Sequence, residues 1–105
     1  MSGFELGCNA KEFKYYVYNL NVYLENFEEK RDDVLKLQAS KIEKYTLNLI
    51  TYLEHMQKDV KEFYKHLPDN ERSTVKNEYT EIIEKIKFNM SNAYCDLNDL
   101  SHKNV

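Results

Sequence analysis

The sequence predicts an all-α protein, an antiparallel up-down-up bundle of three helices, for three reasons. Its 105 residues contain only two glycines and one proline, fewer than an all-β domain or a disordered chain requires. Its apolar residues recur at steps of three and four, which is the spacing of one helix face. Its single proline, Pro68, lies between two long amphipathic segments, where a proline ends a helix.

The first helix is expected at about residues 9–29, after a flexible segment at residues 1–8. Asn9 and Glu12 have the spacing of a capping box at its start. Its apolar face consists of Phe13, Tyr16, Val17, Leu20, Tyr23, Leu24 and Phe27. Six consecutive charged residues follow at positions 28–33. Because a core cannot accept unpaired charges, this run predicts the first turn.

The second helix is expected at about residues 33–66. We place its start near Asp33, because the apolar residues of the stretch 34–37 would otherwise lie in a loop with no face to bury. The alternative start is Ser40, which forms a second capping-box pattern with Glu43. The apolar residues of this helix are Leu35, Ile42, Tyr45, Leu49, Tyr52, Met56, Val60, Phe63 and Leu67.

The second turn is predicted at Pro68. The residue before a proline disfavours the helical conformation, so the second helix should end at about His66 and leave Leu67 outside. Asp69 or Asn70 can then cap a third helix at about residues 70–100, which is followed by a tail at residues 101–105. The apolar face of the third helix consists of Val75, Tyr79, Ile82, Ile83, Ile86, Met90, Ala93, Tyr94, Leu97 and Leu100.

The two short turns determine how the helices pack. Three helices joined in this way must alternate in direction, which gives the up-down-up arrangement. Their apolar faces then meet in one core. The contact expected between the second and third helices joins Val75, Tyr79, Ile82 and Ile86 to Met56, Val60 and Phe63.

Composition excludes several classes of function. The net charge is only −3 and lysine and glutamate interleave throughout, so no basic stripe can follow a phosphate backbone and nucleic acid is not an expected partner. No apolar run approaches the ~20 residues of a membrane span. Cys8 and Cys95 are too few for a disulfide framework, and without a signal peptide we expect both as free thiols in a reducing compartment.

No catalytic, cofactor or metal site is expected. One helical stripe contains ligand types that a metal accepts, namely His55, Asp59, Glu62 and His66. The stripe borders solvent, and its two histidines would stand about 16 Å apart along the helix axis, so we interpret it as a solvated flank. No nucleophile has an evident base partner, and helical rods lack the concave pocket that catalysis usually needs.

The candidate partner-binding residues are three tyrosines and one valine. Tyr15, Tyr18 and Val22 form a second apolar stripe on the first helix. The stripe has two explanations: a wide apolar arc that touches two neighbouring helices, or an exposed surface that docks a partner, for which tyrosine is well suited. Tyr64 is expected to be another exposed aromatic residue of this kind.

Three stretches follow one another within about residues 10–95: residues 49–60 (LITYLEHMQKDV), residues 67–72 (LPDNER) and the tyrosine-containing segment Tyr79–Lys87. This layout resembles the N-terminal domain of vesicle-transport v-SNAREs of the Vti type. In that family a charged linker joins the first two helices, and a Leu-Pro turn with a following basic residue precedes the third.

The resemblance implies a non-enzymatic regulatory domain on the cytoplasmic face of Golgi or endosomal membranes, acting in vesicle transport and membrane fusion. The implied partners are trafficking adaptors, including ENTH-domain proteins, and other SNAREs through the parent chain. SNARE heptads with a central glutamine and a C-terminal membrane anchor are not present in this sequence. The resemblance therefore implies the regulatory domain of a longer protein, which would meet the membrane only through that absent C-terminal anchor. Two alternatives stay open: a spectrin-like structural spacer, or a lineage-specific helical scaffold or exported module.

Overall fold

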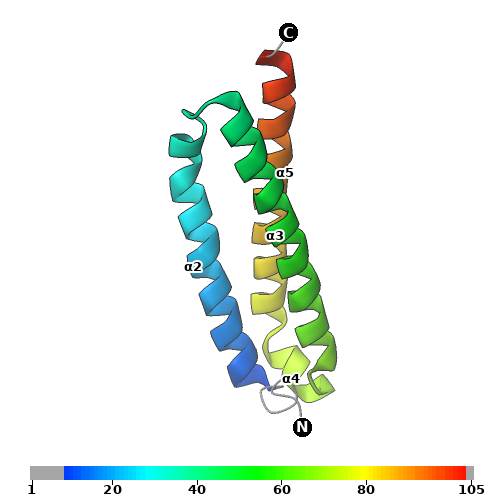
Figure 1. The fold of residues 1–105 in the computed structure, drawn as a ribbon. Coiled ribbons are helices and arrows are strands. Elements are labelled where there is room, and N and C mark those ends of the chain that lie inside the picture. Colours follow the sequence, from blue (N-terminus) through cyan, green and yellow to red (C-terminus); the bar gives the residue numbers. More distant parts are fainter. Residues whose placement is uncertain (1–8, 104–105) are drawn as a thin grey trace.

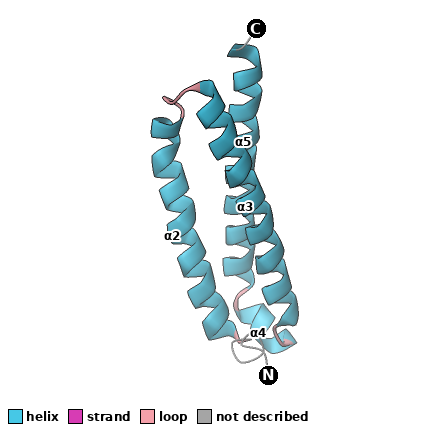
Figure 2. Cartoon of the chain, in the orientation of Figure 1, coloured by secondary structure: helices cyan, strands magenta, loops and turns pink. Residues whose placement is uncertain are grey.

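The computed structural model describes residues 9–103, and within this range the chain is helical apart from short connections (Figures 1 and 2). Four helices follow one another: α2 (Ala10–Val34), α3 (Ala39–His66), α4 (Asp69–Thr74) and α5 (Lys76–Lys103). No strand occurs among these residues, so the predicted all-α class is confirmed. The flexible segment expected at residues 1–8 lies outside the described residues.

The three long helices lie alongside one another. In Figure 1, α2 rises from the lower end, α3 descends and α5 rises again, while the short α4 lies at the lower end. The fold is elongated, with dimensions of 54 × 27 × 19 Å. α3 packs more extensively on α5 than on α2, and this difference determines which face of α3 is buried.

α2 starts as predicted but ends later. The Asn9 side chain accepts a hydrogen bond from the Glu12 backbone N–H at 2.9 Å, which caps the helix. The predicted end near residue 29 is wrong, because the helix continues through the charged run to Val34. A helix can carry such a run on its solvent side: most of these residues are exposed, and Arg31 forms an ion pair with an acidic residue of α5.

α3 starts later than predicted. Its first residue is Ala39, and its cap is Gln38, which has extended backbone (φ −63°, ψ 148°) and makes no side-chain cap hydrogen bond. Neither the favoured start near Asp33 nor the alternative cap at Ser40 is therefore observed. The sequence favours the earlier start because apolar residues are expected to be buried and not to lie in a loop. Leu37 does lie in the α2–α3 loop, where it is 47% exposed.

The turn at Pro68 is confirmed. α3 ends at His66, and Leu67 leaves the helix with extended backbone (φ −70°, ψ 143°) while remaining buried. The expected caps at Asp69 or Asn70 are wrong, because Pro68 itself is the N-cap of α4. Its carbonyl oxygen accepts hydrogen bonds from the N–H groups three and four residues later, at 3.0 and 2.9 Å.

The third predicted helix, residues 70–100, is divided into α4 and α5. The break falls at Val75, whose backbone (φ −117°, ψ 15°) is not helical and whose N–H donates to the Arg72 carbonyl at 3.2 Å. The two hydroxyls before it donate to backbone carbonyls of the preceding turn, Ser73 to Asn70 at 2.9 Å and Thr74 to Glu71 at 2.7 Å. Such bonds compete with the helical ladder. α5 then continues to Lys103, so the expected tail is helical as far as residue 103.

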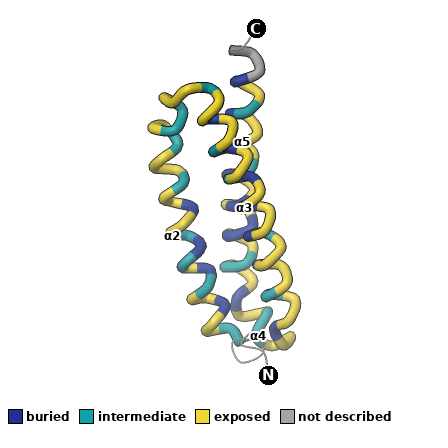
Figure 3. Tube along the Cα trace, viewed as in Figure 1, coloured by how far each residue is buried: buried dark blue, intermediate teal, exposed yellow. Residues whose placement is uncertain are grey.

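The core lies along the inner faces of the long helices (Figure 3). Its main apolar cluster consists of Phe13, Val17, Leu20, Leu24, Leu53, Met56, Val60, Leu67, Val75, Ile82, Ile83 and Ile86. Phe63 and Tyr79 are half-buried and pack against this cluster. The packing predicted between the residues that follow Pro68 and those that precede it is therefore confirmed.

The buried face of α3 differs from the prediction in its first half. The sequence predicts Tyr45, Leu49 and Tyr52 inside the core. The structure instead buries the residue that follows each of them, which are Thr46, Ile50 and Leu53, and leaves Tyr52 46% exposed. One residue is a rotation of about 100° around a helix. α3 packs more extensively on α5 than on α2, and of the three predicted residues Leu49 still packs, half-buried, against the main apolar cluster.

Candidate functional site

The interior of the molecule changes chemical character along α5. The inward-facing positions of this helix begin with Ile82 and Ile86, which are fully buried, and continue with Asn89, Ala93 and Asp96, which are also buried. Thr46 of α3 is buried near the last three. Buried polar side chains are therefore gathered in the half of the interior nearest the α2–α3 connection, where they lie among apolar ones such as Ile42 and Leu100.

Arg31 of α2 and Asp96 of α5 form a bidentate ion pair in this polar half. Nε of Arg31 donates to Oδ2 of Asp96 at 3.1 Å, and Nη2 donates to Oδ1 at 2.8 Å. The Asp96 side chain is 11% exposed and that of Arg31 is 40% exposed. The hydrogen bonds to Asp96 raise the pKa of Arg31 above its ordinary value. The pair fastens the C-terminal part of α2 to α5.

Two further polar contacts join the same helices. The buried Asn89 donates from Nδ2 to Oε1 of Glu28 at 3.3 Å and to the carbonyl oxygen of Lys85 at 2.9 Å. Lys85 in turn donates from Nζ to Oδ1 of Asn21 at 2.9 Å. The bonds of Asn89 satisfy a buried amide that would otherwise be costly at a helix interface, whereas the contact between Lys85 and Asn21 is exposed.

A groove of about 270 Å³ opens where α2, α3 and α5 meet beside these contacts. Its apolar walls are Phe27, Val34, Leu35, Tyr45, Leu49 and Phe88. Thr46 and Ala93 also line it, and their small side chains leave the space that larger residues fill elsewhere in the core. The volume is below the ~300–1,000 Å³ of small-molecule sites, but it suits a few side chains of a docked peptide or helix.

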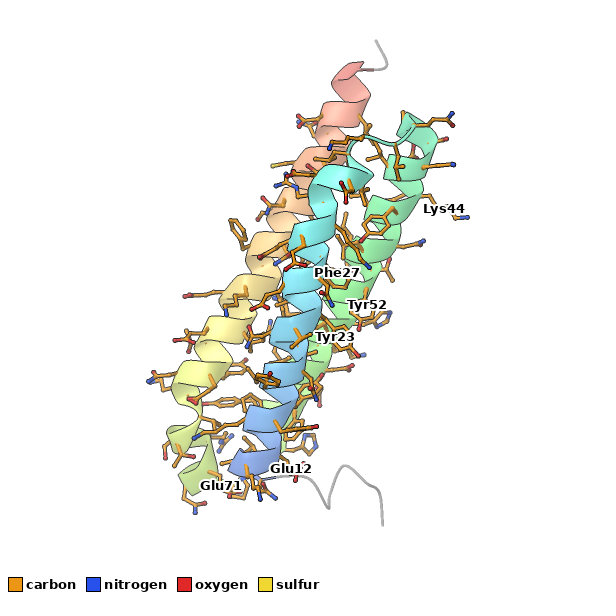
Figure 4. The ribbon with its side chains drawn as sticks, turned by 90° about the vertical axis from the view of Figure 1, so that its left-hand side faces the viewer. Glu12, Tyr23, Phe27, Lys44, Tyr52 and Glu71 are labelled. Carbon is orange, nitrogen blue, oxygen red and sulfur yellow. The ribbon has the colours of Figure 1, made fainter. Side chains whose placement is uncertain are left out.

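The groove combines aromatic surface with negative charge. Phe88 is 59% exposed, and the rings of Phe27 and Tyr52 lie next to each other at the α2–α3 seam, with centroids 5.7 Å apart (Figure 4). Three carboxylates, those of Glu28, Asp32 and Asp96, line the groove, against the single guanidinium of Arg31. This arrangement can bind apolar side chains that are flanked by basic residues.

This groove was not predicted from the sequence, although part of its signal is present there. The series Ile82, Ile86, Asn89, Ala93, Asp96 and Leu100 has the same steps of four and three as the apolar face. Reading Asn89 and Asp96 as inward-facing would have predicted a polar interior. Their partners on α2 could not be predicted in the same way, because Arg31 lies 65 positions from Asp96.

The predicted binding stripe on α2 is exposed. Tyr15, Tyr18 and Val22 are 66%, 66% and 42% exposed. Each lies two residues from a buried residue of α2, which is about 200° around the helix. The stripe therefore faces away from α3 and α5, and a wide apolar arc that touches both neighbours does not explain it. Its role in binding stays a prediction.

Tyr64 is not the exposed residue that the sequence predicts. It is half-buried, and its ring stacks on that of Tyr79 with centroids 3.9 Å apart and an interplanar angle of 8°. Its hydroxyl donates to the Arg72 carbonyl oxygen at 3.4 Å. The segment after Pro68 covers this side of α3, which removes Tyr64 from the candidate binding surface. Burial of Tyr79, together with the neighbouring Tyr64, raises the pKa of Tyr79.

The histidine stripe of α3 is spread along the helix. Nδ1 of His66 donates to the carbonyl oxygen of Glu62 at 2.7 Å and lies 4.0 Å from the carboxylate of the same residue. Among the residues that the structure describes, no three His, Cys, Asp or Glu side chains are grouped so that they could hold a metal ion. Cys95 is a free, exposed thiol, and Cys8 lies outside the described residues.

Comparison with known proteins adds no family. No protein-family model matches the chain, and neither a curated protein nor a solved structure matches it. Between residues 9 and 103, none of the helices has the length and apolar character needed to cross a membrane.

Proposed function

We propose that this chain is a non-enzymatic protein-interaction domain, the N-terminal regulatory domain of a v-SNARE at the cytoplasmic face of Golgi or endosomal membranes. The three long helices form one antiparallel up-down-up bundle, and α4 belongs to the turn between α3 and α5. The Leu67–Pro68 turn, which lies where the family resemblance requires it, supports the SNARE assignment. The partner is a trafficking adaptor such as an ENTH-domain protein, and other SNAREs are engaged through the parent chain.

The observation that carries the interaction role is the groove between α2, α3 and α5. Exposed apolar residues scattered singly are normal on a protein surface, whereas a contiguous apolar patch with a polar rim is typical of an interaction site. Phe27, Tyr45 and Phe88 come from three different helices and line one concave surface. Arg31 and Asn89 in the groove already bond to Asp96 and Glu28. Because these polar groups are occupied, the groove is better suited to binding a partner than to catalysis.

The charges of the groove define the partner's chemistry. Asp96 is compensated by Arg31, so the remaining negative charge comes from Glu28 and Asp32. We therefore propose that the occupant is an amphipathic helical segment of the adaptor. Its apolar side chains, spaced three or four residues apart, enter the groove. Its lysine or arginine residues meet the two carboxylates, which increases the rate of association and fixes the orientation.

The groove is tested by titrating the chain with a purified ENTH-domain protein in a calorimeter. Phe88→Ala should raise the Kd at least about tenfold, as truncation of a central aromatic contact does. Asp32→Lys should also raise the Kd and should weaken the salt dependence of binding. The matched control is Tyr94→Ala, because Tyr94 is 51% exposed on the same helix and does not line the groove. No binding, or equal losses in Phe88→Ala and Tyr94→Ala, would contradict the assignment.

The SNARE assignment is tested separately by the parent gene downstream of Val105. We expect a heptad segment of about 60 residues with a central glutamine, followed by an apolar run of ~20 residues. A stop codon or a further helical repeat would refute this assignment and favour a free-standing scaffold or spacer. The result is independent of the groove titration, so the two parts of the proposal can fail separately.

A further inference from the structure

The exposed side of α2 carries a regular row of residues that the groove does not use. This row, the outer stripe, consists of Lys11, Tyr15, Tyr18, Val22 and Glu25. All five are exposed. They recur at steps of four and three, the average period of 3.5 with which helices pair in a coiled coil. The outer stripe therefore has the spacing of a helix-pairing seam that no helix of the described chain covers.

The position of the outer stripe leaves it accessible to another helix. It lies on the opposite side of α2 from the buried residues Phe13, Val17 and Leu20, because two residues correspond to about 200° of rotation. α3 and α5 both pack on the buried side. A second helix laid along the outer stripe would thus meet α2 alone.

We propose that a second copy of this chain docks on the outer stripe in antiparallel orientation. Two charged residues of the stripe lie at equal distances from Tyr18, Lys11 seven residues before it and Glu25 seven residues after it. An antiparallel pair with its twofold axis at Tyr18 therefore sets Lys11 opposite Glu25 of the second copy, twice. The same axis sets the two Tyr18 rings against each other and places Tyr15 opposite position 21, next to Val22 of the second copy. One surface thus complements itself, as an isologous dimer requires.

The charges select this arrangement over two alternatives. A parallel pair would set Lys11 against Lys11 and Glu25 against Glu25, and like charges at such positions destabilise helix pairing. A different protein as partner would need only charges opposite to those of α2. It would give no reason for the lysine and glutamate to lie at equal distances from the central tyrosine. A second copy gives that reason.

The dimer is expected to be weak. One pair of helices buries less than the ~1,200–2,000 Å² of a stable interface, and ion pairs in solvent contribute little each. The groove lies on the inner side of α2, where Phe27, Glu28 and Arg31 line it. The two surfaces share no residue, so a groove partner and a second copy can bind at the same time.

Sedimentation equilibrium of the 105-residue chain provides the test. At about 0.5 mM a contact with a Kd of about 100 μM is mostly formed, so a dimer should be detected. Lys11→Glu or Glu25→Lys alone should raise the dimer Kd about tenfold, because each change creates two like-charge pairs. The double variant Lys11→Glu/Glu25→Lys should restore the wild-type Kd. Tyr18→Lys, which sets two ammonium groups together on the axis, should leave a monomer.

Matched controls separate this contact from general charge effects. Glu43→Lys and Lys44→Glu make the same charge changes at exposed positions of α3, and they should leave the dimer Kd unchanged. Circular dichroism of each variant confirms that the helices are intact. A wild-type chain that stays monomeric at about 0.5 mM would overturn the proposal. Failure of the double variant to restore the dimer would overturn the antiparallel pairing.

Discussion

Replacing Arg31 by glutamine should destabilise the fold more than replacing Asp96 by asparagine, because the two ends of this ion pair are unequally buried. The Asp96 side chain is 11% exposed and that of Arg31 is 40% exposed. Without Arg31, a carboxylate remains in a nearly buried position with no cation, which is strongly unfavourable. Without Asp96, the long arginine side chain can turn its charge to solvent.

The magnitude follows from the geometry of the pair. A hydrogen bond to a charged group contributes about 1.5–3 kcal/mol, and an exposed ion pair about 0.2–1 kcal/mol. The two hydrogen bonds, at 2.8 and 3.1 Å, favour the larger of these free energies. The exposed end of the arginine is screened by water, which lowers it. We therefore expect a coupling free energy of about 1–2 kcal/mol between the two side chains.

A double-mutant cycle measures this coupling directly. The wild type, the two single variants and the double variant are unfolded with urea, with ellipticity as the signal, and their free energies of unfolding are compared. The coupling should fall in about 1 M salt, where exposed charges are screened. Lys30→Gln, at an exposed neighbouring position, is the control and should change stability little. A coupling below about 0.3 kcal/mol, or a larger loss from Asp96→Asn than from Arg31→Gln, would refute the reasoning.

Two further predictions concern the core and its tyrosines. Ile82 is fully buried, so Ile82→Ala should cost about 2–5 kcal/mol, and an unchanged urea midpoint and slope would refute the packing of α5 on α3. Burial, with the negative charge of Asp59, raises the pKa of Tyr16 to about 12, above its unfolded value of about 10. The neutral phenol therefore stabilises the fold fully below pH 10, and this contribution is lost as the pH rises from about 10 to 12. When the pH is raised from 9 to 11, the free energy of unfolding of Tyr16→Phe should therefore fall by about 1 kcal/mol less than that of the wild type. This figure is reduced for partial solvent screening. Tyr15→Phe, at an exposed position, should behave as the wild type.

The elements that the sequence predicts well are those determined by local chemistry. Pro68 ends α3 through its own ring and its effect on Leu67, and both effects act within two residues. The cap at Asn9 likewise depends on a group three residues away. The isoleucines of α5 recur at helical spacing, so their burial follows from the period alone.

The elements that the sequence did not predict depend on contacts between distant residues. α2 passes through the charged run partly because Arg31 meets Asp96, 65 positions away. The buried face in the first half of α3 is shifted by one residue from the predicted one. α3 packs more on α5 than on α2, and the spacing of residues within α3 does not reveal this preference. The groove results from both effects, since Arg31 and Thr46 line it.

The change from isoleucine to asparagine and aspartate along α5 makes the stability of the molecule uneven from end to end. Large apolar side chains such as Phe13 and Val75 lie at the Pro68 end, where backbone amides should exchange with solvent only through global unfolding. Around the α2–α3 connection, buried polar residues interrupt the apolar interior and Ile42 and Leu100 lie outside the main apolar cluster, so local opening at lower free energy should dominate exchange there. The groove lies in that less stable half. A partner bound in it would stabilise the part that opens most readily, and slowed amide exchange there would report its binding.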